Sequence, residues 1–243
     1  TGKVEQYNEK KITKNAKRAC KGLDCTDPNV VVMNAQLKLY EGVTTNEIDE
    51  SLIKSACGLI EQEPNYRFVA ARLLLGTIYK EVFGEGVDSD AFDYQYRQSF
   101  LKNLKELIKT KILREDLKTL DLKKIAQALK PERDFQFAYI GLQTAKDRYL
   151  IKKADKLLES PQAWLMRVAM GLAIAEKEED RTEWAIKFYD KLSSFDYMTS
   201  TPTLFYSGNV RNQLSSCFLS TFEDSIYGIF DGLHQEAQKS KFA

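Results

Sequence analysis

Helix-capping residues followed by apolar side chains at helical spacing recur along most of this chain, and they constrain its fold more than any other feature. Thr44 and Glu47 have the Thr-x-x-Glu spacing of a capping box, and apolar residues follow it at helical spacing: Ile48, Leu52, Ile53, Ala56, Leu59 and Ile60. Ser160 provides a capping hydroxyl directly before Pro161, which suits the first helical position. The sequence therefore predicts a mainly α-helical fold with small β elements.

The beginning of the chain predicts a compact helical bundle with a small β cap. Residues 3–7 alternate polar and apolar side chains, which is typical of one strand of a small hairpin. Asn8 can cap a helix that ends near Gly22. Pro64 interrupts the helical pattern, and a further helix is expected over residues 66–83.

Residues 91–198 predict a second helical region. Trp164 and Trp184 lie at spacings that indicate buried core anchors rather than platforms for a ligand. A short strand is expected at residues 149–151. Helices are expected over residues 100–113, 122–129, 135–144, 162–176 and 182–192.

The last segment, residues 199–243, is richer in Pro, Ser, Thr and Gly than the helical regions. Its apolar runs at residues 204–206 and 217–219 predict the first strands of a sheet. A helix is expected next, with the apolar residues Ile226, Ile229, Phe230 and Leu233. Because the chain offers no partner strands for these two, the sequence predicts the beginning of a domain that another segment or chain completes.

Charge and hydropathy argue against two classes of partner. The chain has 36 basic and 35 acidic side chains, so no overall field favours nucleic acid or an anionic membrane surface. Its most apolar run, residues 163–175, is interrupted by Arg167 and is too short to span a bilayer. No secretory signal is visible. A cytoplasmic protein with no nucleic-acid or membrane partner is therefore expected.

Cysteine spacing argues against a metal site. Cys20, Cys25, Cys57 and Cys217 form no CxxC pair, and His234 is the only histidine, so zinc coordination is not expected. Cys217 differs from the others because it lies in a polar, serine-rich setting where a thiol can be reactive. A small hydrophobe on a buried strand is the alternative for this residue.

Hydroxyl side chains cluster around Cys217. The segments Pro202-Thr203, Ser207-Gly208 and Ser215-Ser216-Cys217 are followed by Asp224-Ser225-Ile226. Neutral hydroxyls can hydrogen-bond a phosphate without burying a fixed charge, and a thiol can form a disulfide if a second cysteine comes close. This joint spacing, together with Lys187-Phe188-Tyr189-Asp190, resembles the N-terminal part of the large, catalytic subunit of class I ribonucleotide reductases.

The resemblance covers essentially the whole chain and implies its domain organisation. Residues 1–90 would form an ATP-cone domain that lacks its first strand, and residues 91–198 the helical N-terminal domain. Residues 199–243 would begin the ten-stranded catalytic α/β barrel. The implied enzyme is a ribonucleoside-diphosphate reductase, an oxidoreductase that makes deoxyribonucleotides for DNA replication.

The resemblance also implies roles for four residues of the last segment. Cys217 matches a first-strand cysteine that is one of two reducing thiols and enters a disulfide in each turnover. Thr203 and Ser216 match residues that contact the substrate, and Asp224 matches an acid of the specificity site, which binds a deoxynucleoside triphosphate effector. From the residues alone, Asp224 could instead cap the helix that follows it.

In the first domain the resemblance implies an allosteric site for ATP or dATP with Mg²⁺. A lysine and a helix N-terminus are suited to bind polyphosphate. The positions that match nucleotide-binding residues are Glu5, Asn8, Lys11, Thr45 and Lys80. Asp49 stands where some members have histidine. Solvent-facing or capping roles are the alternatives, and no Walker loop, GxxxxGK[ST], is present.

The implied reaction needs components beyond this chain. A cysteine radical removes the 3′ hydrogen of a ribonucleotide, the 2′ hydroxyl leaves as water, and a dithiol supplies two electrons. The implied partners are the ribonucleotide substrate, a chain or segment completing the barrel, a radical-generating small (beta) subunit with its metal-radical cofactor, and a thioredoxin- or glutaredoxin-type reductant. The chain alone is therefore expected to be inactive, whether it is a naturally split subunit or a fragment.

A noncatalytic nucleotide-sensing module is the main alternative function. In it the cone would bind ATP or dATP and the helical region would contact other proteins, with no active thiol. A plain helical scaffold is a poorer alternative. The three hypotheses differ in whether Cys217 is needed and in whether a nucleotide binds.

Overall fold

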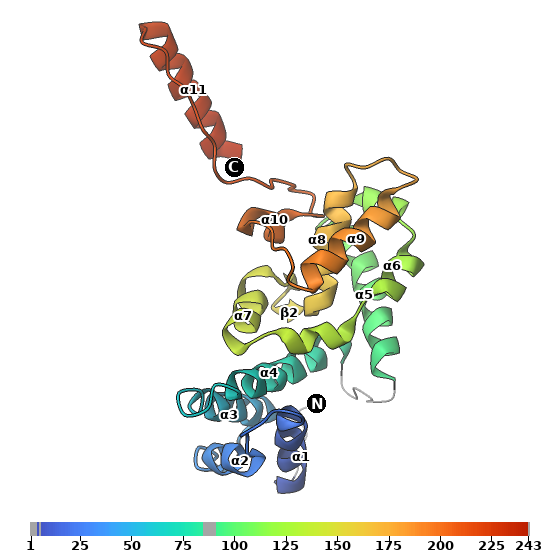
Figure 1. Cartoon of the computed structure of the whole chain (residues 1–243), viewed down its shortest axis with the longest axis vertical. Helices are drawn as coiled ribbons and strands as arrows, with labels where there is room; N and C mark the ends of the chain where they lie inside the picture. Colours follow the sequence, from blue (N-terminus) through green and yellow to red (C-terminus); the bar gives the residue numbers. More distant parts are fainter. Residues whose placement is uncertain (1–3, 5, 85–90, 243) are drawn as a thin grey trace. The chain divides into compact units, whose positions relative to one another are not determined.

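The computed structural model describes residues 4, 6–84 and 91–242, and these residues are mainly helical (Figure 1). Within the described part, the strands form one two-stranded antiparallel sheet. Backbone contacts divide the chain into two compact units. The first unit comprises Thr1–Ser99 and Lys130–Gln162, and the second comprises Phe100–Leu129 and Ala163–Ala243.

Four helices open the first unit: α1 (Glu9–Cys20), α2 (Pro28–Gln36), α3 (Thr45–Cys57) and α4 (Tyr66–Phe83). α4 packs against α1 and α3, and α2 packs against the same two helices (Figure 1). The side chains buried in this bundle include Ile12, Ala16, Val31, Leu52, Ala56, Val69, Leu73, Leu74 and Ile78. The helices predicted from Asn8, from the capping box and after Pro64 are thereby confirmed.

Helix α2 was not predicted, although a local signal for it exists. The Asp27 Oδ1 atom accepts a hydrogen bond from the Asn29 backbone N at 2.8 Å, and Pro28 occupies the first helical position. This is the same cap-then-proline arrangement that marked the helix at Ser160 and Pro161.

The predicted β cap is not found in the described part of the chain. Val4, Gln6 and Tyr7 lie outside regular secondary structure, and Val4 is fully exposed. Lys3 and Glu5 lie outside the described residues. An alternating segment needs a neighbouring strand to form a sheet, and none of the described residues supplies one here.

The first unit continues through α5 (Phe92–Lys109), η2 (Pro131–Gln136), α7 (Tyr139–Thr144), η3 (Ala145–Tyr149), β1 (Lys152–Lys153) and β2 (Lys156–Leu157). The single helix predicted over residues 135–144 is thus two short elements. The strand predicted at residues 149–151 is wrong, because Tyr149 ends η3 and the hairpin begins at Lys152. Ala154 and Asp155 form its two-residue loop, and both have positive φ, 48° and 62°, as a type I′ turn requires.

The second unit contains α5 from Phe100 onward, η1 (Glu115–Thr119), α6 (Leu122–Ala128), α9 (Arg181–Ser193), α10 (Thr201–Tyr206) and α11 (Ile226–Phe242). α8 (Pro161–Ala173) has its first two residues in the first unit and the others in the second. The predicted helices correspond to these elements, with differences at their ends: α5 spans Phe92–Lys109 rather than residues 100–113, and α8 ends at Ala173 rather than at residue 176. Trp164 is buried as predicted, and its Nε1 donates to the Leu204 carbonyl at 3.1 Å. Trp184 was predicted to be buried but is 36% exposed, with its ring against Phe188.

The strands predicted at residues 204–206 and 217–219 are wrong. Residues 204–206 form the end of α10, which has Pro202 in its first turn, where the fixed φ of proline favours a helix. Residues 217–219 lie outside regular secondary structure. The described residues therefore show no beginning of a barrel sheet. They also include no helix with both the length and the apolar character that crossing a membrane requires.

Candidate functional site

The predicted nucleotide-binding lysine lies in an ion pair that joins two helices. Lys80, near the end of α4, places its Nζ 2.5 Å from Oδ2 of Asp49, in the second turn of α3. The Lys80 side chain is 54% exposed, whereas that of Asp49 is only 12% exposed. The structure thus brings the predicted phosphate-binding Lys80 into contact with Asp49, from a different helix.

The α3 N-terminus presents Thr45 to solvent while its neighbours make the cap. Thr44 Oγ1 accepts from Glu47 N at 3.3 Å, and Glu47 Oε2 accepts from Thr44 N at 2.8 Å. Tyr40 Oη donates to Glu47 Oε1 at 2.6 Å. The hydrogen bonds from Tyr40 and Thr44 lower the pKa of Glu47 to about 2. Because Thr44 is the capping residue, capping does not account for Thr45, which is the first helical residue and is exposed.

Two other predicted nucleotide-binding residues lie at the start of α1. The Asn8 side chain accepts hydrogen bonds from Lys10 N and Lys11 N at 3.1 and 3.3 Å, so it caps the helix as predicted. Lys11 is exposed in the first turn of the same helix. Glu5, the remaining predicted residue, lies outside the described residues.

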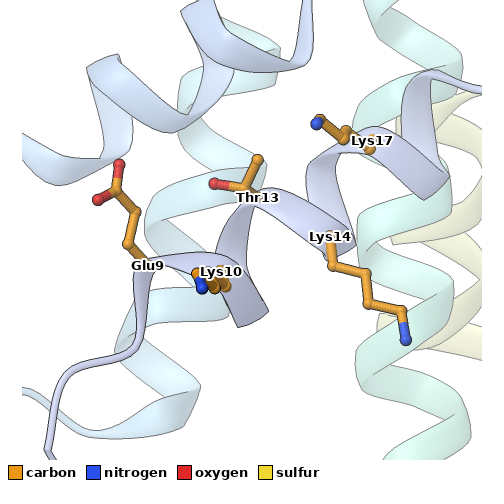
Figure 2. A pocket seen from close by; sticks show the side chains of 5 residues that line it. All are labelled: Glu9, Lys10, Thr13, Lys14 and Lys17. Carbon is orange, nitrogen blue, oxygen red and sulfur yellow. The ribbon is translucent and has the colours of Figure 1, made fainter.

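An open pocket on α1 was not predicted. Figure 2 shows the side chains that line it, Glu9, Lys10, Thr13, Lys14 and Lys17. Three lysines on one helical face give this surface a positive charge. Their spacing of three or four residues was the available sequence signal, but such spacing is also typical of a solvated helix face.

A buried carboxyl group joins four elements of the first unit. Asp134, in η2, is fully buried. Its Oδ2 accepts hydrogen bonds from Tyr79 Oη of α4 at 2.7 Å and from Tyr96 Oη of α5 at 2.9 Å. Its Oδ1 accepts from Gln162 Nε2 of α8 at 3.0 Å, and Tyr96 Oη itself accepts from Gln162 N at 3.0 Å. No local sequence pattern marks Asp134, so this cluster was not predicted.

Burial changes the titration of this carboxyl cluster. Desolvation raises the pKa of Asp134 to about 7, against the hydrogen bonds from Tyr79, Gln162 and Tyr96, which favour the charged form. Burial and the neighbouring Asp134 also raise the pKa of Tyr79 and of Tyr96 well above their ordinary value. The two tyrosines therefore act as hydrogen-bond donors throughout the physiological pH range.

In the second unit, α8 contacts residues 205–208, which lie in sequence between the two predicted substrate-binding residues. The buried Arg167 donates through its guanidinium to the Ser207 carbonyl at 2.7 Å and to the Phe205 carbonyl at 3.4 Å. Ser207 Oγ donates to the Val168 carbonyl at 2.8 Å. Gly208 has a positive φ of 83°, which glycine adopts readily. Ser207 and Gly208 therefore fix this segment against α8. The Ser207 hydroxyl is used in that contact and is not presented to a phosphate.

Thr203 and Ser216 lie in different environments. Thr203 is 8% exposed, and its Oγ1 donates to the Leu214 carbonyl at 3.2 Å and lies 3.3 Å from Ser200 Oγ. Ser216 is exposed, with Oγ 3.9 Å from Sγ of Cys217. Cys217 is a free, exposed thiol, so the buried-hydrophobe alternative does not describe it here.

Asp224 is exposed directly before Ser225 and α11. Ser225 Oγ accepts from Gly228 N at 3.0 Å, so Ser225 makes the capping hydrogen bond that was considered for Asp224. The described residues contain no group of three or more His, Cys, Asp or Glu side chains suited to a metal ion.

Comparisons with known proteins match two separate parts of the chain. A family model for the ATP cone domain matches residues 1–81, and a model for the ribonucleotide reductase all-alpha domain matches residues 135–212.

Proteins similar to this chain are found in bacteria and viruses. The ribonucleoside-diphosphate reductase subunit alpha of Chlamydia muridarum is 40% identical over 93% of this chain. The subunit alpha of Helicobacter pylori strain 26695 is 37% identical over 99% of it, and the large subunit of Monkeypox virus is 36% identical over 96%. This chain spans 22% to 30% of the length of these relatives.

Proposed function

Because this chain belongs to the ribonucleotide reductase large-subunit family, we propose that it supplies the allosteric cone and part of the catalytic site of a ribonucleoside-diphosphate reductase. One observation carries the proposal: the ATP cone and the reductase all-alpha domain occur in order in one chain. Catalysis then requires a segment or chain that completes the barrel, and a radical-generating small subunit that carries the metal-radical cofactor.

We propose that Cys217 is one of the two reducing thiols of this enzyme. Two thiols together supply two electrons and two protons as they form a disulfide, while the 2′ hydroxyl of the ribonucleotide leaves as water. An external dithiol of the thioredoxin or glutaredoxin type then reduces the disulfide. The exposed, unpaired state of Cys217 supports this role, because a buried thiol could not reach a substrate or a second cysteine.

The other predicted residues would bind substrate and effectors. Thr203 and Ser216 offer neutral hydroxyls for the ribonucleotide, and Asp224 is proposed to contact the deoxynucleoside triphosphate at the specificity site. ATP or dATP, with Mg²⁺, would bind the cone through Asn8, Lys11, Thr45 and Lys80, together with Glu5. The exposure of Lys80 and Thr45 supports access of a polyphosphate to these residues.

Cys217→Ser is expected to reduce turnover by about 1,000-fold or more in the completed assembly, because serine cannot form the disulfide. Ribonucleotide reduction is measured with the remaining barrel segment, the small subunit and a dithiol reductant present. Cys25→Ser removes another free, exposed thiol and should leave turnover unchanged. Full activity of Cys217→Ser would contradict the catalytic proposal and favour the noncatalytic nucleotide-sensing module.

Lys80→Ala is expected to weaken ATP and dATP binding by about 10-fold or more, as hydrogen bonds to charged groups contribute roughly 1.5–3 kcal/mol. Calorimetric titration of the chain measures the dissociation constants. Lys54→Ala is the matched control, since Lys54 is an exposed lysine of α3 that pairs with Glu50. If the wild-type chain binds neither nucleotide, the cone proposal is wrong and the helical scaffold is favoured.

A further inference from the structure

The Asp49–Lys80 ion pair changes what an approaching nucleotide meets. Oδ2 of Asp49 lies 2.5 Å from Nζ of Lys80, so the positive charge of Lys80 is already paired with a carboxylate before any phosphate binds. An anion at this position therefore meets a pair with no net charge rather than a lone cation. Binding to Lys80 must replace an existing attraction, not only add a new one.

We propose that Asp49 competes with the nucleotide polyphosphate for Lys80. In the empty site Asp49 pairs with Lys80, and this pairing raises the nucleotide concentration that is needed for binding. This inference rests on the proposed nucleotide site. It assigns to Asp49 a role opposite to that of a ligand, because its carboxylate opposes binding of an anion. Asp49 thereby becomes a determinant of how much ATP or dATP is needed to occupy the cone.

The burial of the two partners makes the competition unequal. Asp49 is only 12% exposed, so water replaces a lost partner poorly, whereas Lys80 is 54% exposed and can turn towards solvent or a ligand. When a phosphate takes Lys80, the Asp49 carboxylate is left partly buried and without its cation. The nucleotide thus has to compensate for both the lost ion pair and the poorly solvated carboxylate.

The ion pair also ties α3 to α4, since Asp49 lies in the second turn of α3 and Lys80 near the end of α4. The packing between these helices does not depend on the pair alone, because α3 and α4 contact each other along their lengths and both carry buried apolar side chains, such as Leu52, Ala56 and Leu73. Exchange of Lys80 between carboxylate and phosphate can therefore occur without loss of the helical bundle. Asp49 therefore changes the charge that Lys80 presents to a nucleotide, without changing the packing of the helical bundle.

Asp49→Asn is expected to tighten ATP and dATP binding by about 3- to 10-fold, the range for a partly exposed ion pair of about 0.7–1.4 kcal/mol. Asparagine keeps the size of the side chain and removes its charge. Calorimetric titration of the full chain, with and without Mg²⁺, measures the change. In the Lys80→Ala background the same substitution should have less than about a twofold effect, because the two side chains act on each other.

Glu50→Gln is the matched control. Glu50 is the neighbouring carboxylate on α3, it pairs with Lys54 at 3.1 Å, and both side chains are more than 60% exposed. Its neutralisation removes the same charge from the same helix and should change affinity less than about twofold. Thermal unfolding of each variant establishes that the bundle remains folded.

The remaining outcomes separate this inference from the proposed function. Weaker binding by Asp49→Asn, in the presence or absence of Mg²⁺, would make Asp49 a ligand of the nucleotide or its metal and would overturn the competition. An effect no larger than that of Glu50→Gln would overturn it as well. If instead the wild-type chain binds no nucleotide, or Lys80→Ala binds as tightly as wild type, the nucleotide site itself fails.

Discussion

Asp134→Ala should lower the free energy of unfolding by about 3–5 kcal/mol, because removal of one partner from a buried polar cluster leaves the others without compensation. The hydroxyls of Tyr79 and Tyr96 and the amide of Gln162 all donate to this carboxyl group. Tyr96 Oη also accepts a hydrogen bond from the backbone N of Gln162, the second residue of α8. Loss of the carboxylate would therefore also weaken the contacts that hold the start of this helix. Urea denaturation of the full chain measures the change.

Asp134→Asn is the conservative comparison. Asparagine keeps the shape of the side chain and one carbonyl acceptor, so a smaller loss of about 1–2 kcal/mol is expected. Tyr79→Phe removes a single donor and should fall in the same range. Equal stability of wild type and Asp134→Ala would show that the hydrogen bonds at Asp134 contribute no net stability.

The titration of Asp134 gives this comparison a pH dependence. Its pKa is about 7 in the folded state, against an ordinary value of 3.8. The folded state therefore binds the proton more tightly, and the stability from this group is complete below about pH 4 and is lost as the pH rises through 7. The stability of wild type relative to Asp134→Asn should fall between about pH 4 and pH 7, by at most roughly 1.4 kcal/mol per pH unit. A difference that is constant with pH would contradict the raised pKa.

Gly171→Ala is expected to destabilise the second unit by about 3 kcal/mol or more. The added methyl group would overlap backbone atoms, which cannot move aside as a flexible side chain can. A Cβ atom at Gly171, on α8, would overlap the backbone nitrogen of Gly208 and Oγ of Ser207. The close approach of α8 to this segment therefore depends on the missing side chain. Limited proteolysis near residues 200–217 and urea denaturation measure the effect.

Gly76→Ala is the matched control for this substitution. Gly76 is also a helical glycine, in α4, and a Cβ atom there would meet nothing within 4 Å. Alanine should stabilise the chain by about 0.5–1 kcal/mol, because glycine is the poorer helix former. A destabilisation by Gly171→Ala no larger than the effect of Gly76→Ala would contradict the steric account.

The helices that were predicted well are those with local caps. Asn8, Thr44 and Ser160 each stand next to the helix that they mark, so side chain and backbone a few residues apart define its start. The run at residues 204–206 has no such unambiguous signal, because a short apolar segment fits a helix or a strand equally well. Pro202 in its first turn favoured the helix, and this signal was overlooked.

Candidate site residues could be proposed one by one from the sequence, but their contacts in the folded chain could not. Lys80 and Asp49 were each identified along the sequence, yet their contact joins positions 31 residues apart and needs the packing of α3 on α4. Asp134 has partners 28, 38 and 55 residues away and no local pattern at all. Trp184 shows the reverse case, since helical spacing suggested a core position that tertiary packing does not supply.

The contact between Arg167 and the C-terminal end of α10 affects which amino acids can be exchanged there. The guanidinium recognises the carbonyls of residues 205 and 207, which every amino acid carries. The side chain at position 205 can therefore vary while the main chain keeps its path. Arg167 itself has less freedom, because its Nη1 atom donates to both carbonyls and lysine, with a shorter side chain and no planar guanidinium, would not place a donor at the same point.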